Sequence, residues 1–106
     1  MSLSYHFENG HHVLSGDLAE EEINSLREFI KTVEHTPLVF DLRDVEISSG
    51  VAMVECITWL RELSLDRDLV LWFAPQMLAH SLYKTNILQQ GRITLHEPRF
   101  DSGIGV

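Results

Sequence analysis

Six histidines are the side chains of this sequence that could most readily bind a metal ion. His11 and His12 are adjacent, so in a strand their side chains point to opposite faces and cannot hold one ion together. His6 could lie across a hairpin from one of them. The other three lie near the ends of predicted elements, without the spacing of zinc ligands: His35, His80 and His96. The pattern therefore predicts surface histidines, with no bound metal or cofactor.

The single cysteine and the serines show no arrangement typical of nucleophilic catalysis. Cys56 falls inside an apolar helical segment, which predicts a buried, inert thiol. The sequence contains no nucleophile elbow, no Walker phosphate-binding loop and no G-x-G-x-x-G motif. One cysteine also excludes an internal disulfide and a cysteine-rich metal site. We therefore expect that the protein is not an enzyme.

One further polar group, Ser48-Ser49-Gly50, precedes the most apolar helical segment, residues 51–63. A serine at the start of a helix accepts a hydrogen bond from the first helical turn, so the simplest interpretation is a helix cap. On residues alone this interpretation is favoured over a binding or modification site. The elements that position the serines must therefore be considered.

The first elements are predicted to be a hairpin and a helix. Residues 4–8 alternate apolar and polar side chains, which predicts a strand, and residues 12–14 are predicted to form the antiparallel strand beside it. Asn9-Gly10 joins them, because both residues tolerate the positive φ of a tight hairpin turn. Asp17 and Glu20 fit a capping box that would begin a helix. The buried stripe of this helix consists of Ile23, Leu26, Ile30 and Val33.

Three later strands are each preceded by a helix. Residues 38–41 and 69–73 are continuous apolar runs, typical of strands covered on both faces, and residues 92–95 form a short last strand. Residues 43–47 are expected to form a loop, and Pro75 to begin a helix. Buried positions are expected in both later helices and at both tryptophans: Cys56, Ile57, Leu60, Met77, Leu78, Ser81, Leu82, Trp59 and Trp72.

This order predicts a single α/β domain over residues 4–96. Its mixed β-sheet has an N-terminal hairpin, with helices following strands 2, 3 and 4 through right-handed crossovers. A chain of 106 residues with 44% apolar side chains suits one core. Residues 97–106 are expected to be a flexible tail, because they contain Pro98, Gly103 and Gly105.

The net charge of −8 argues against nucleic acids and anionic membranes as partners, because both are bound through basic surfaces. No apolar run reaches the roughly 18 residues needed to cross a bilayer, so no membrane insertion is expected. The N-terminus is polar and acidic, which predicts no signal peptide and a cytoplasmic location.

Four segments together resemble the STAS domain, the fold of anti-sigma factor antagonists and of the cytoplasmic domains of sulfate transporters. Residues 13–18, Val-Leu-Ser-Gly-Asp-Leu, are similar to its first signature, and residues 39–45 to its Asp-Leu-x-x-Val. Residues 48–51, Ser-Ser-Gly-Val, are similar to the end of its Asp-Ser-Ser-Gly-Leu, and residues 69–88 to its last helical unit. The resemblance covers about residues 5–95. Ile47 stands where the family has Asp, and the preceding loop is two residues shorter than usual.

The resemblance implies an interaction domain that docks a kinase-like anti-sigma factor, with Ser48 as the candidate phosphoacceptor. Binding surfaces gather beyond the carboxyl ends of parallel strands. The expected partner-binding surface around Ser48 comprises Ser15, Gly16, Asp17, Glu46, Ile47, Ser49, Gly50 and Pro75. Two alternatives remain open. One is a STAS subunit held permanently on another protein, such as the ATPase of an ABC transporter, with Ser48 only a cap; the other is a small-ligand-binding domain using the same surface.

Overall fold

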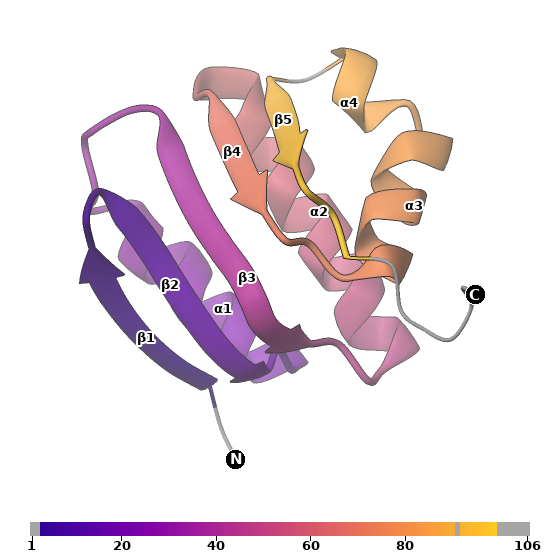
Figure 1. The fold of residues 1–106 in the computed structure, drawn as a ribbon, viewed down its shortest axis with the longest axis horizontal. Coiled ribbons are helices and arrows are strands. Elements are labelled where there is room, and N and C mark those ends of the chain that lie inside the picture. The colour runs from indigo at the N-terminus through magenta and orange to yellow at the C-terminus, as the bar shows by residue number, and fades with distance from the viewer. Residues whose placement is uncertain (1–2, 91, 100–106) are drawn as a thin grey trace.

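A five-stranded mixed sheet in the order β1-β2-β3-β4-β5 carries the fold (Figure 1). The computed structural model describes residues 3–90 and 92–99. β1 is antiparallel to β2, and every other neighbouring pair is parallel. The strands are β1 (Leu3–Glu8), β2 (His11–Asp17), β3 (Leu38–Glu46), β4 (Leu69–Trp72) and β5 (Ile93–His96).

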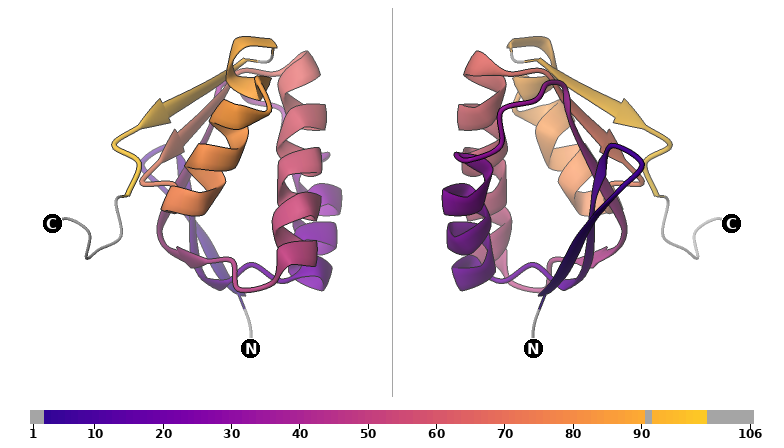
Figure 2. Two further views of the ribbon diagram at one scale, coloured as in Figure 1. Left: turned by 90° about the vertical axis from the view of Figure 1, so that its right-hand side faces the viewer. Right: turned by 90° about the vertical axis from the view of Figure 1, so that its left-hand side faces the viewer.

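Three helices cover one face of this sheet and follow β2, β3 and β4 (Figure 2). They are α1 (Glu20–Ile30), α2 (Gly50–Asp66) and α3 (Gln76–Lys84), and the short α4 (Ile87–Gln90) leads into β5. Because each crossover moves the chain one strand further in the same direction, connections of one hand gather the helices on one face. The predicted small α/β domain with a mixed sheet, an N-terminal hairpin and parallel neighbours β3 and β4 is confirmed.

The hairpin turn and the core also follow the sequence pattern. Asn9 and Gly10 have φ values of 54° and 81°, the positive-φ pair that a tight hairpin turn requires. Cys56 and Leu60 are buried as predicted, whereas Ile57 is only half-buried. The core between sheet and helices includes Leu14, Ile23, Ile30, Phe40, Cys56, Trp59, Leu60, Leu69, Leu71, Leu78 and Leu82.

The loop predicted for residues 43–47 is wrong, because β3 continues to Glu46. A register shift opposite Leu14 inserts one extra residue into β3, after which Gly16 pairs with Val45 and Asp17 with Glu46. Val45 is fully buried, so the strand gains a core contact beyond its charged residues Arg43 and Asp44. The charges that suggested a loop lie exposed on the strand.

The helix boundaries and one helix face also differ from prediction. α1 begins at Glu20 with Ala19 as its N-cap, so Asp17 does not cap it. α2 runs three residues further than expected, with Ser64 buried. Met77 was expected to face the core but is 63% exposed, because Leu78 and Leu82, one turn apart, form the inner face of α3.

Two aromatic side chains lie elsewhere than predicted. His12 is not a surface residue, because it is 1% exposed and lies on the helix-covered face of β2. Trp72 is half-buried on the opposite, uncovered face, where it stacks on His96 with ring centroids 4.5 Å apart. Of the predicted tail, the structure describes residues 97–99, and residues 100–106 lie outside the described chain.

Candidate functional site

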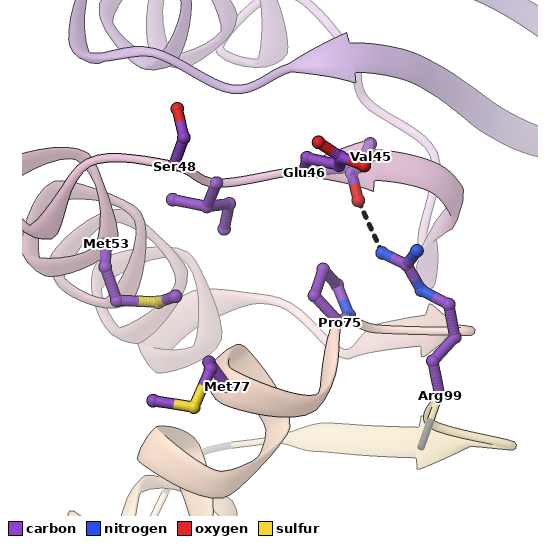
Figure 3. A pocket seen from close by; sticks show the side chains of 8 residues that line it. Val45, Glu46, Ser48, Met53, Pro75, Met77 and Arg99 are labelled. Atoms are coloured by element: carbon purple, nitrogen blue, oxygen red, sulfur yellow. Dashed lines mark hydrogen bonds between the residues drawn. The ribbon is translucent and has the colours of Figure 1, made fainter. Parts of the chain in front are cut away.

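A cavity of about 350 Å³ opens beyond the carboxyl ends of β3 and β4 (Figure 3). The end of β3, the loop to α2, and the first turns of α2 and α3 surround it. The residues that line it are Val45, Glu46, Ile47, Ser48, Met53, Pro75, Met77 and Arg99. The cavity therefore opens at the sheet edge where the sequence predicts a binding surface.

Ser48 is exposed in the loop before α2 and is held by Asp17 at the end of β2. One carboxylate oxygen of Asp17 accepts hydrogen bonds from the Ser48 hydroxyl at 3.1 Å and from its backbone N–H at 3.3 Å. Asp17 pairs with Glu46 in the parallel ladder. Because Ser48 follows Glu46 by two residues, it lies within hydrogen-bonding distance of the Asp17 carboxylate. Asp17 thus contacts Ser48 instead of capping α1.

The cap of α2 is Ser49 rather than Ser48. Ser49 has extended backbone angles, and its hydroxyl oxygen accepts a hydrogen bond from the Ala52 N–H at 3.2 Å. This is the geometry of an N-cap serine, which satisfies a free donor of the first helical turn. The Ser48 hydroxyl has no part in this cap and points away from Met77 and Pro75 (Figure 3).

Apolar side chains line the cavity next to the serine. Met53 extends from α2 and Met77 from α3 into the space between the two helices (Figure 3). Pro75, the N-cap of α3, and Ile47 complete the apolar wall. Methionine side chains adapt to irregular partners, so exposed methionines are common on protein-binding surfaces.

Arg99 closes the cavity from the C-terminal side. Its guanidinium donates hydrogen bonds to the carbonyl oxygens of Phe73, at 3.0 Å, and Val45. Its backbone N–H donates to the Ala74 carbonyl at 2.9 Å. These bonds tie the segment after β5 to the ends of β3 and β4, within the region predicted to be a flexible tail.

The predicted surface residues are brought together only in part. Glu46, Ile47, Ser48 and Pro75 line the cavity, and Asp17 joins them through its hydrogen bonds to Ser48. The other predicted residues do not line the cavity: Ser49 and Gly50 follow Ser48 in the chain, and Ser15 and Gly16 pair with β3 in the ladder. Sequence reasoning missed Met53, Met77 and Arg99. The exposure of Met77 was hidden by the apolar pattern of its helix.

Comparison with known proteins adds no relative from which a function can be transferred. No model of a known protein family matches this chain, and a search of the curated proteins gives no significant match. Within residues 3–90 and 92–99, no three His, Cys, Asp or Glu side chains are placed to hold one metal ion. In the same part of the chain, no helix is both long and apolar enough to span a membrane. The site must be interpreted from its own geometry.

Proposed function

We propose that this chain is a protein-interaction domain of the STAS type, resembling anti-sigma factor antagonists. Its docking surface is the cavity at the carboxyl edge of the sheet together with Ser48. The single observation that supports this most is the exposed Ser48 beside a cavity whose lining includes Met53, Pro75 and Met77. A partner that covers the methionines would also cover the serine.

Phosphorylation of Ser48 is the proposed switch. A phosphate adds roughly −1.5 to −2 charges, and it replaces the hydroxyl hydrogen through which Ser48 now donates a hydrogen bond to Asp17. The new charge would lie beside the Asp17 carboxylate, so repulsion turns the phosphoserine outward, toward the docked partner. A charge buried at that interface carries a desolvation cost, so the modified domain should release a kinase-like anti-sigma factor.

Incubation with a purified anti-sigma factor kinase and ATP tests the phosphoacceptor. We expect one added phosphate by mass spectrometry, located on Ser48, and no phosphate on the Ser48→Ala variant. Ser49→Ala is the matched control, because it changes the adjacent hydroxyl and should still be phosphorylated. Phosphate on Ser49, or none on any variant, would contradict the proposed switch.

Binding of the kinase-like anti-sigma factor tests the docking surface separately. Ser48→Asp should weaken binding and Ser48→Ala should retain it. Met77→Glu should abolish binding, whereas Val54→Glu, at a similarly exposed position of α2, should leave binding unchanged. An equal effect of the two glutamate variants would place the partner elsewhere.

A second candidate is a STAS subunit held permanently on another protein, such as a transporter ATPase. Two observations favour it: Ile47 replaces the acidic residue of the family motif, and the Ser48 hydroxyl is bound to Asp17. In that case the cavity with its two methionines would still dock the partner. Equal affinity for wild type, Ser48→Asp and Ser48→Ala, with binding lost in Met77→Glu, would select this candidate.

A further inference from the structure

A second cavity, of about 270 Å³, lies between α1 and α2, toward the C-terminal ends of both helices. The two helices pack side by side on the sheet (Figure 2). Arg27 lines the cavity from α1, and Trp59 and Leu63 from α2. Leu63 lies 14 residues beyond the Ser49 cap, which at the rise of an α-helix is roughly 20 Å. This cavity is therefore separate from the Ser48 site.

Three buried nitrogen atoms of residues that line this cavity have no hydrogen-bond acceptor among the residues that the structure describes. They belong to Trp59 Nε1 and to Arg27 Nε and Nη2. The Trp59 side chain is only 3% exposed, so solvent does not satisfy its indole N–H. Buried donors without an acceptor are rare and each costs about 1–3 kcal/mol. Their concentration at one cavity indicates that an acceptor belongs there.

The two Arg27 nitrogens that lack a hydrogen-bond acceptor define the shape of that acceptor. Nε and Nη2 of one guanidinium present nearly parallel N–H groups, which a carboxylate accepts with both oxygens at once. The neighbouring carboxylates are too distant for such bonds: Glu62 Oε1 lies 3.6 Å from Nη2 and Glu55 Oε1 lies 3.8 Å from Nη1. A quarter of the Arg27 side chain is exposed, but Nε and Nη2 are themselves buried, so a ligand carboxylate has to displace the exposed Glu62 side chain to reach them.

We propose that the cavity between α1 and α2 binds a small monocarboxylate. Its carboxylate would pair with the Nε and Nη2 groups of Arg27, with the Trp59 indole N–H as a third donor. Its apolar body would lie against Trp59 and Leu63, which supply the apolar part of the lining. The volume suits a chain of a few carbons rather than a lipid or a nucleotide.

The Trp59 indole N–H provides a direct readout of binding. The chain has two tryptophans, and the Trp72→Phe variant leaves Trp59 as the one indole in a proton–nitrogen correlation NMR spectrum. Millimolar butyrate should shift the Trp59 indole resonance in a saturable manner, as expected for a new acceptor. Butyramide, the neutral molecule of the same shape, should not. In wild type, the Trp72 indole serves as an internal control and should not move.

Variants of the charged residues separate the proposed site from nonspecific anion binding. Arg27→Lys keeps the charge but removes the paired N–H groups, so the apparent affinity for butyrate should fall about tenfold or more. Glu62→Gln removes the nearest competing carboxylate and should strengthen binding. The proposal fails if butyrate leaves the wild-type Trp59 resonance unmoved, or if Arg27→Lys binds as tightly as wild type while folded. A shift produced only in Glu62→Gln would mean that Glu62 itself is the acceptor in solution, which also overturns the proposal.

Discussion

At the scale of single residues, His12 is a buried titratable side chain whose pKa is lowered by folding. Its Nδ1 is hydrogen-bonded to the Tyr5 hydroxyl at 2.8 Å, and its Nε2 to His35 Nε2 at 3.1 Å. Burial, and then the charges of His35 and Arg67, lower the pKa of His12 below its usual 6.5. The neutral imidazole satisfies both neighbours, whereas protonation of both histidines would bring two N–H donors face to face.

The free energy of unfolding should therefore decrease as the pH falls. Because the folded pKa of His12 lies below the unfolded value, the unfolded chain binds more protons as the pH falls below about 6.5. The free energy of unfolding, from urea titrations, should decrease there by up to about 1.4 kcal/mol per pH unit for this one proton. His12→Phe should flatten this dependence, and His6→Gln, at an exposed histidine, should not. An unchanged slope in His12→Phe would assign the effect to another group.

Cys56 should be chemically inert in the folded protein. Its side chain is 2% exposed, and burial raises the pKa of its thiol to about 12. Since the thiolate is the reactive species, a thiol reagent should label Cys56 only as fast as the protein unfolds. Labelling measured by mass should be complete in denaturant and negligible without it. Rapid labelling of the native protein would show that α2 opens locally.

At the scale of elements, the two adjacent serines should differ in their effect on α2. Ser49→Ala removes the N-cap bond to Ala52 and should lower the free energy of unfolding by about 1 kcal/mol. Ser48→Ala removes an exposed bond to Asp17 and should cost at most about half of that. Urea titrations of both variants measure the difference. A larger loss for Ser48→Ala would assign the capping role to Ser48 after all.

The same serines show what the sequence can and cannot predict. Asn9-Gly10, the apolar runs and the strand–helix alternation determine the elements and their order, because they act through local geometry and burial. The continuation of β3 depends on pairing with β2 across a register shift, which no local pattern reveals. The predicted capping of α1 by Asp17 is wrong for the same reason. Asp17 precedes α1 in the chain, but the pairing of β2 with β3 places Ser48 next to its carboxylate.

At the scale of the whole molecule, all helices lie on one face, and no helix of the described residues 3–90 and 92–99 covers the other face of the sheet (Figure 2). Trp59 packs edge-on against Phe40 in the covered core, with ring centroids 5.7 Å apart. Trp72 lies on the uncovered face near His11 and His96. The two tryptophans therefore report on opposite faces of one sheet. Alternate side chains of β4 point to the two faces, so Trp72 lies outside the core although it belongs to an apolar run.

Because the core is one continuous cluster, we expect the two faces of the sheet to unfold in a single transition. Leu60 is buried in α2 within a cluster that includes residues of all three main helices and of β2, β3, β4 and β5. Leu60→Ala should therefore lower the free energy of unfolding by about 2–5 kcal/mol, through lost burial and the cavity left behind. The loss in free energy of unfolding should be the same when unfolding is followed by Trp59 fluorescence in the Trp72→Phe background and by Trp72 fluorescence in the Trp59→Phe background. Far-ultraviolet circular dichroism should give the same midpoint in each background. Within either variant, a fluorescence midpoint that differs from the circular dichroism midpoint would mean that the β4–β5 half of the sheet unfolds independently of the α1–α2 layer, which a shared core does not permit.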